Sequence, residues 1–299
     1  MTSHDVVSRV RRLAGTRKVG HAGTLDPMAT GVLVLGINRA TRLLGHLMLT
    51  EKGYDATIRL GRTTTTDDAE GETTSTTPAG QVTESEIRSA LEQFVGDIEQ
   101  VPTAVSAIKV DGKRAYQRVR DGETVALEAR PVTVHEIVVH GTTVVEEDPE
   151  HPVTTVVEEV AQRASRNHSF VDVRVSVRCS SGTYIRAIAR DLGAALGVGG
   201  HLTALRRTAV GGFDLSTART LDQLGDEFTV VPIADAARAT FPAYELSDEQ
   251  AGDVRVGRKL RIGLTAITAV FAPDGEFLAL YEPVVENPEL ARALAVFTG

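Results

Sequence analysis

The sequence has little cysteine, few aromatic residues and no long apolar run. Cys179 is the single cysteine among 299 residues, which excludes an intrachain disulfide and suits a reducing compartment. No apolar run approaches the roughly 20 residues that cross a bilayer. The first five residues also lack the charged and apolar regions of a signal peptide. Together these absences predict a cytoplasmic protein with no membrane partner.

The common motifs of metal and nucleotide chemistry are also missing. The chain has no Cys/His cluster at zinc spacing, no HExxH, no GxxxxGK[ST] and no GxGxxG leading into a helix. Cys179 ends an alternating run, residues 171–178, so we interpret it as a packed strand thiol and not as a nucleophile. We expect neither a metal nor a cofactor.

The charge of the chain is unevenly distributed. The net charge of −8 argues at first against a nucleic-acid partner, but distribution matters more than the total. Residues 1–60 carry nine basic and four acidic side chains, and residues 174–210 carry six arginines and one aspartate. Residues 221–299 sum to −7. The basic segments indicate an RNA-binding surface. The alternative is the ordinary variation in charge between segments of this size.

One predicted loop is notable because a carboxylate follows two glycines in it. The stretch from Gly20 to Pro27 reads GHAGTLDP, with Gly20 and Gly23 able to adopt tight turns and Asp26 at its end. Asp26-Pro27 is typical of a helix N-cap followed by proline at the first helical position. The same pattern is also compatible with a carboxylate that is exposed and available for catalysis. The local pattern leaves both interpretations open.

The wider string, GHAGTLDPMATGVL over residues 20–33, resembles the aspartate motif of the TruB family, the tRNA pseudouridine-55 synthases. The sequence of this motif is similar to that of bacterial, actinobacterial-like members. Any one short match has a real risk of being false, but the matches follow the family's order along nearly the whole chain. The further segments that carry the resemblance are 52–61, 100–109, 128–131, 181–186 and 201–207.

The resemblance implies a reaction that breaks the C1′–N1 bond of a uridine, turns the base and rejoins it through C5. It implies that Asp26 is the nucleophile, attacking either C1′ of the ribose or C6 of the uracil. Arg186 is expected to pair with that carboxylate. If Thr183 caps the next helix, Arg186 lies in the first turn, where the dipole disfavours a cation and suggests an anionic partner. The alternative is an exposed arginine on a solvated helix face.

The remaining site residues also come from the resemblance. Tyr54 is expected to stack on the uracil and take part in proton transfer at C5, although its alternation with apolar residues equally suits a core tyrosine. Tyr184 and Leu205 are expected to line the pocket. His21 is expected to contact the RNA loop beside the flipped nucleotide, or else to be a hydrogen-bonded loop histidine. The candidate contacts to the RNA backbone are Lys18, Arg206 and Arg207.

The implied fold class is α/β (α+β), with a mixed, largely antiparallel sheet flanked by helices over residues 1–240. A small β-rich, PUA-like domain is expected over residues 241–299. Apolar periodicity and turn signals predict the individual elements. The expected helices are 5–14, 40–49, 83–96, one after Thr183 and a short one near 246–251. The expected strands are 54–60, 103–109, 131–139, 169–179, 201–207, 266–271 and 276–281. The expected loops are an exposed one at 63–80 and an acidic insertion at 142–168.

The expected partner is the T-arm of tRNA, bound by a monomer. One alternative is a relative guided by a separate RNA, and another is a tRNA-binding folding chaperone whose catalysis is secondary or lost. The resemblance also places a short apolar strand and a Lys-Pro turn before the equivalent of Met1. We therefore expect the native protein to begin upstream of Met1.

Overall fold

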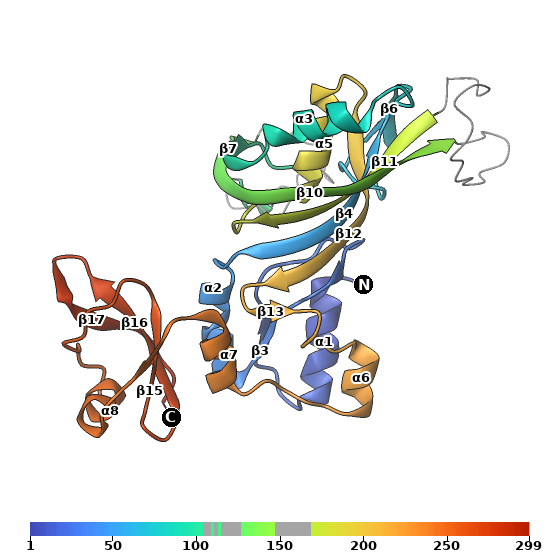
Figure 1. Cartoon of the computed structure of the whole chain (residues 1–299). Coiled ribbons are helices and arrows are strands. Elements are labelled where there is room, and N and C mark those ends of the chain that lie inside the picture. The colour runs from blue at the N-terminus through green and yellow to red at the C-terminus, as the bar shows by residue number, and fades with distance from the viewer. Residues whose placement is uncertain (104–108, 111–112, 115–126, 147–168, 299) are drawn as a thin grey trace. The chain divides into compact units, whose positions relative to one another are not determined.

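The computed structural model folds into two compact units (Figure 1). It describes residues 1–103, 109–110, 113–114, 127–146 and 169–298. The central unit consists of Asp26–Gly31 and Glu51–Thr208. The terminal unit consists of Met1–Leu25, Val32–Thr50 and Ala209–Gly299.

A mixed sheet forms the core of the central unit. Its successive strands are β12 (Gly200–Val210), β4 (Lys52–Leu60), β11 (Ser169–Cys179), β10 (Arg130–Glu146) and β7 (Gly96–Gln100). Strand β11 runs antiparallel to β4 and β10, and β7 runs antiparallel to β10. The short strand β2 (Thr30–Gly31) adds to β12 in the parallel sense. The alternating valines of β11 turn one face of that strand into the core.

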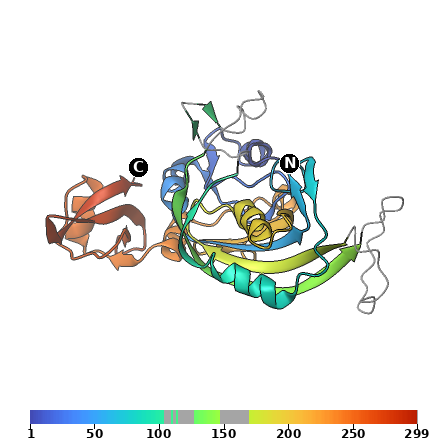
Figure 2. The ribbon, with the colours of Figure 1, turned by 90° about the horizontal axis from the view of Figure 1, so that it is seen from above.

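Two helices of the central unit pack on each other and on the sheet. Helix α3 (Glu84–Glu92) contacts β10, and α5 (Ile185–Ala195) contacts β4. A reciprocal capping box between Thr83 and Glu86 begins α3, as the sequence predicts. In Figure 2 the yellow-green strands curve around the yellow helix α5. The α+β class expected from the sequence is therefore confirmed.

Several element predictions need correction. The expected loop 63–80 contains an antiparallel pair, β5 (Arg62–Thr64) and β6 (Thr73–Thr76). Residues 142–146 continue β10 because they pair with 169–173 of β11, and the rest of the expected acidic insertion, 147–168, lies outside the described residues. Of the expected strand 103–109, residues 104–108 also lie outside them. Lys109–Val110 (β8) pairs with Lys113–Arg114 (β9).

The first part of the terminal unit is built around helix α1 (Ser3–Leu13). A capping box between Thr2 and Asp5 begins this helix, and its valines pack against β1 (Val19–His21). Strand β1 pairs antiparallel with β3 (Leu35–Ile37). The expected helix 40–49 is shorter and divided into a 3-10 turn, η1 (Asn38–Arg42), and α2 (Leu44–Leu47).

The second part of the terminal unit contains a four-stranded sheet. Strand β14 (Ala243–Glu245) runs parallel to β15 (Thr268–Phe271), which continues antiparallel into β16 (Phe277–Val284) and β17 (Asn287–Val296). The predicted hairpin is therefore confirmed. The remaining elements are α6 (Leu221–Asp226), α7 (Ile233–Thr240), α8 (Asp248–Arg255) and β13 (Phe213–Asp214). Across the described part of the chain, no helix is long and apolar enough to cross a membrane.

Gly31 allows the parallel pairing between β2 and β12. Its φ is +98°, in the left-handed region that favours glycine. A Cβ at this position would lie 2.1 Å from the carbonyl oxygen of Arg207 on the paired strand. Any side chain at residue 31 therefore pushes the two backbones apart.

We expect Gly31→Ala to lower the free energy of unfolding by roughly 2 kcal/mol or more, through backbone strain and the clash with β12. The matched control is Gly45→Ala in α2, where an added Cβ meets nothing within 4 Å. That change should be neutral or stabilising by about 0.5 kcal/mol. Denaturant unfolding measures both, and equal effects would contradict this account of Gly31.

Candidate active site

Asp26 lies in a tight turn and not at the start of a helix. The amide of Ala29 donates to the carbonyl of Asp26 at 2.9 Å, and Pro27 occupies the second turn position, where its fixed φ is favourable. Because no helix follows, the N-cap interpretation of Asp26-Pro27 is wrong. Met28 and Ala29 pack against the core of the central unit. The Asp26 side chain remains 32% exposed, so its carboxylate is held in place yet accessible.

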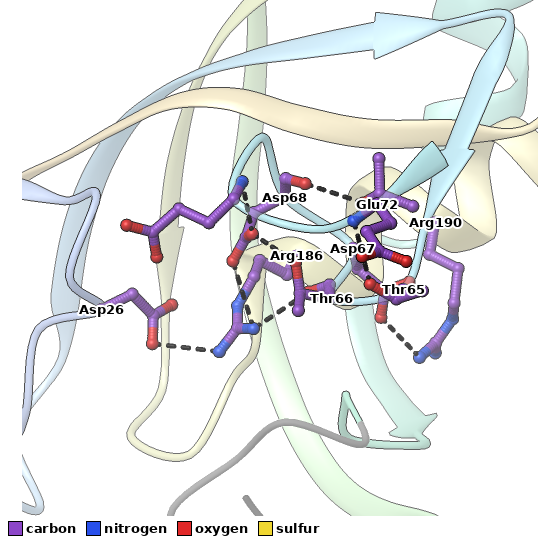
Figure 3. Close-up of polar contacts among 10 residues, drawn as sticks. Asp26, Thr65, Thr66, Asp67, Asp68, Glu72, Arg186 and Arg190 are labelled. Carbon is purple, nitrogen blue, oxygen red and sulfur yellow. Dashed lines mark hydrogen bonds and ion pairs between the residues drawn. The ribbon is translucent and has the colours of Figure 1, made fainter. Parts of the chain in front are cut away.

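Arg186 joins Asp26 to a second carboxylate, Asp68 (Figure 3). Its Nη2 lies 3.0 Å from Oδ1 of Asp26, and its Nη1 lies 3.3 Å from Oδ2 of Asp68. The same Nη1 donates to the carbonyl of Thr66 at 3.0 Å. The side chains of Arg186 and Asp68 are only 5% and 4% exposed. The interpretation of Arg186 as a solvated surface residue is therefore wrong.

The beginning of α5 differs from the prediction. Its N-cap is Tyr184, with no side-chain cap, and the hydroxyl of Thr183 donates instead to the carbonyl of Ser180. The buried amide of Gln100 binds both backbone groups of Tyr184, accepting from its N–H at 2.7 Å and donating to its carbonyl at 3.1 Å. Arg186 still lies in the first turn, where the helix dipole disfavours a cation. Its two carboxylate partners offset this cost.

The turn that carries Asp68 is held by polar contacts of its own. Oδ1 of Asp68 accepts from the hydroxyl of Thr66 at 2.5 Å and from the amide of Glu70 at 3.1 Å. Asp67 adopts a left-handed φ of +58° and contacts Arg190 at 3.5 Å. Burial raises the pKa of Asp67, while Arg190 acts in the opposite direction. Sequence analysis predicted an exposed loop here and did not identify Asp68 as a site residue.

Tyr54 lies on β4, on the same face as the core residues of that strand. It packs against a cluster that includes Leu205, which is 7% exposed. Burial raises the pKa of Tyr54 to about 12, although a hydrogen bond from Arg207 acts in the opposite direction. The negative charge of Asp26 is a smaller influence that raises this pKa further. The structure therefore joins Tyr54 to Arg207 by a hydrogen bond and places the Tyr54 hydroxyl in the electrostatic field of Asp26.

The neighbouring arginines of β12 occupy opposite faces of the strand. Arg206 is exposed, with Nη1 3.4 Å from the Thr30 hydroxyl, whereas Arg207 is 2% exposed. Because Arg207 is buried, the prediction of a surface cation at this position is wrong. Burial, with the nearby charge of Arg207, also lowers the pKa of Lys52 to about 8.

Two predicted RNA contacts, Lys18 and His21, lie in the terminal unit. Lys18 is exposed, and His21 is half-buried at the end of β1. The ring of His21 makes an edge contact with His4, with centroids 5.9 Å apart. Their roles toward RNA stay predictions.

Two further features concern the cysteine and the side chains that could hold a metal ion. Cys179 is fully buried at the end of β11, and burial raises the pKa of its thiol to about 11. This agrees with the predicted packed thiol, since a reactive cysteine needs its thiolate form. Within the described ranges, no group of three or more His, Cys, Asp or Glu residues is arranged to hold a metal ion.

Comparison with known families gives three matches along the chain. Residues 11–185 match the TruB family pseudouridylate synthase N-terminal domain. Residues 186–236 match the tRNA pseudouridylate synthase B C-terminal domain. Residues 241–298 match the tRNA pseudouridine synthase II C-terminal domain.

Individual proteins are similar over nearly the full length. The tRNA pseudouridine synthase B of Thermobifida fusca is 56% identical over 299 residues, covering 100% of this chain and 95% of that protein. The protein of the same name from Arthrobacter sp. is 56% identical over 289 residues, covering 93% and 88%. A chain from the structure of an H/ACA RNP bound to a substrate RNA containing 2′-deoxyuridine is similar in fold, with a TM-score of 0.69 at 23% identity. The match covers 100% of this chain and 82% of that one.

Removing the charge of Asp68 should destabilise the protein. Asp68→Asn keeps the shape of the side chain but leaves the buried guanidinium of Arg186 with fewer anionic partners. We expect a loss of about 2–3 kcal/mol in the free energy of unfolding. The control is Asp222→Asn, whose side chain is 89% exposed beside Arg9, with an expected loss below about 1 kcal/mol. Similar losses in denaturant unfolding would rule out a special role for the buried pair.

Lys52 should make stability rise with pH. Its pKa is about 8 in the folded state, below its ordinary value of 10.5, so between these values the unfolded chain binds more protons. The free energy of unfolding therefore increases with pH in this window. Relative to Lys52→Met, wild type should gain about 2 kcal/mol from pH 7.5 to 9.5. Exposed Lys259, replaced by Met, controls for the loss of one charge, and parallel wild-type and Lys52→Met profiles would refute the idea.

Proposed function

Because the chain belongs to the TruB family of pseudouridylate synthases, we propose that it converts uridine to pseudouridine in tRNA. Two relatives at 56% identity over nearly the full length are named tRNA pseudouridine synthase B. The H/ACA RNP chain, at 23% identity, supports the fold alone. The finer assignment is uridine 55 in the T-loop as the target and the T-arm as the bound part of the tRNA.

The observation that carries the chemistry is the contact between Asp26 and Arg186. A nucleophilic carboxylate must stay anionic, keep a fixed direction and still reach the substrate. The buried guanidinium of Arg186 lies 3.0 Å from Oδ1 of Asp26, whose side chain is one-third exposed. Attack by Oδ2 on C1′ or C6 then leaves the contact with Arg186 in place. The planar guanidinium, itself held by Asp68 and Thr66, orients the carboxylate better than a lysine would.

The remaining site residues are assigned to substrate binding. We assign Tyr54, Tyr184 and Leu205 to the surface around the flipped uracil, since aromatic and apolar side chains suit the faces of an extruded base. Tyr54 is the candidate for proton transfer at C5. The RNA loop and backbone are assigned to His21, Lys18 and Arg206, through polar contacts and exposed positive charge.

The reaction is an isomerisation without redox change or phosphate transfer, so the proposed mechanism uses no cofactor and no metal. We propose that a cytoplasmic monomer carries it out, with the catalytic domain in residues 1–240. Residues 241–299 form the proposed PUA-like RNA-binding module. The four-stranded sheet β14–β17 and the family match over 241–298 support this division.

The alternative function is a tRNA-binding folding chaperone with secondary or lost catalysis. Turnover of an unmodified tRNA transcript, without added RNA or cofactor, separates the two possibilities. It also excludes dependence on a separate guide RNA. A transcript with cytidine at position 55 tests the target, because the proposed enzyme then has no uridine to convert at that position.

We expect Asp26→Asn to abolish pseudouridine formation, because the amide keeps the shape of the side chain and removes the anionic nucleophile. Binding of tRNA should stay within about threefold of wild type, since the change removes no positive charge that meets phosphate. Release of tritium from C5 of labelled uridine measures turnover, and filter binding measures affinity.

The control for this substitution is Asp222→Asn on the exposed surface, which should turn over normally. Substantial activity of pure Asp26→Asn would remove Asp26 from the role of nucleophile. An inactive wild-type protein that still accelerates tRNA folding would favour the chaperone.

A further inference from the structure

Buried Arg207 is a charged side chain that the proposed chemistry does not use. It is 2% exposed and among the largest fully buried side chains in the described part of the chain. A guanidinium keeps its charge inside a protein, so its burial is costly unless acceptors surround it. A binding surface for RNA phosphates has no need of a side chain in this position. The burial therefore points to a role inside the central unit.

The strand geometry directs Arg207 toward Tyr54. Strand β12 lies next to β4 in the sheet, and residues two apart on a strand share a face. Arg207 therefore shares a face with Leu205, and the core cluster around Leu205 packs against Tyr54. The guanidinium hydrogen-bonds to the hydroxyl of Tyr54. Exposed Arg206 lies on the other face.

The direction of this hydrogen bond has a chemical consequence. A guanidinium can only donate, whereas a tyrosine hydroxyl both donates and accepts. The Tyr54 oxygen is therefore the acceptor, and its own hydrogen must point to another group. A donor from Arg207 thus fixes both the position of the Tyr54 ring tip and the direction of the hydroxyl hydrogen. The negative charge of Asp26 acts on the same hydroxyl and disfavours its loss of a proton.

The backbone of Arg207 is fixed by the loop that carries Asp26. Arg207 is the parallel partner of Gly31, and Gly31 follows Asp26 by five residues. The absence of a side chain at Gly31 permits this close approach. Arg207 is thus anchored through its backbone to the nucleophile's loop and through its side chain to Tyr54.

We propose that Arg207 is a positioning residue that holds the hydroxyl of Tyr54 toward the reacting uridine. This inference rests on the proposed function, because it assigns a role within that reaction. It replaces the view of Arg207 as a surface contact to phosphate. Replacing Arg207 should therefore lower the rate of the chemical step, and this loss should depend on the hydroxyl oxygen of Tyr54.

A double-mutant cycle tests this coupling. The single-turnover rate of pseudouridine formation is measured with enzyme in excess for wild type, Arg207→Met, Tyr54→Phe and the double variant. Arg207→Met should slow the rate by about tenfold or more, with tRNA affinity within about threefold. In the Tyr54→Phe background, the same change should cost less than about twofold, because the hydroxyl through which Arg207 acts is already gone.

Arg88→Met is the control, since it removes the same charged group from an exposed position on α3 beside Glu84. It should leave the single-turnover rate unchanged. Arg206→Met, at the exposed neighbouring position, should instead flatten the dependence of tRNA affinity on salt. Multiplicative losses in the cycle, or a normal rate for Arg207→Met, would overturn the proposal. So would a loss of affinity and salt dependence at unchanged rate for Arg207→Met.

If Arg207→Met fails to fold, Arg207→Lys and Arg207→Gln take its place in the cycle, with melting temperatures measured alongside. Both keep a donor on a long side chain but lack the planar fork of the guanidinium. We therefore expect a smaller loss of rate, and a loss that persists in the Tyr54→Phe background would overturn the proposal. An inactive wild-type protein would instead count against the proposed function, so the two failures are distinguishable.

Discussion

The geometry of the candidate site depends on the buried guanidinium of Arg186, which is held between two carboxylates. Buried charges are stable only when their partners are well placed. Arg186 meets this condition through Asp26, Asp68 and the carbonyl of Thr66. These partners come from separate segments of the central unit, so the arginine can be satisfied only when those segments are folded together. Stability and the geometry of the candidate site are thereby linked at one side chain.

Contacts in the surrounding structure hold the backbone next to Arg186 and its buried partner in place. The amide of Gln100 fixes the backbone of Tyr184 at the beginning of α5, two residues before Arg186. The hydroxyl of Thr66 and the amide of Glu70 hold the carboxylate of Asp68. These contacts fix the backbone just before Arg186 and one of its two carboxylate partners. Asp26, with a side chain that is one-third exposed, is the member of the group left accessible to solvent.

Sequence analysis predicted the parts of this protein that local patterns determine. The helix that begins after Thr83, the short helix near 246–251, the alternating strand 169–179 and the hairpin after residue 266 were all predicted from short-range signals. Asp26 and Arg186 were found through their motifs. The features that were missed depend on long-range contacts. Asp68 looks like any aspartate in a polar loop, and no local signal marks it as the partner of an arginine 118 positions later.

Two predictions were wrong because they depend on contacts with residues that are distant in the sequence or on the face of a strand. Thr183 has the chemistry of a helix cap, but its hydroxyl turns back to Ser180 while Gln100 binds the first turn. Arg206 and Arg207 look equivalent as a basic pair, yet strand alternation exposes one and buries the other. Basic pairs on a strand cannot be assigned to a surface until the face of each residue is known.

The same alternation gives the adjacent arginines a role in folding. A slip of β12 by one residue would turn every side chain on it to the opposite face of the sheet. Leu205 would then leave the core and Arg206 would enter it, away from the hydroxyl that Arg207 reaches in the correct register. Such a shift would also move the carbonyl that faces Gly31 and disturb the parallel pairing with β2. The burial of Leu205 and Arg207 on one face, together with the close backbone approach of Gly31, thus selects a single register for the strand.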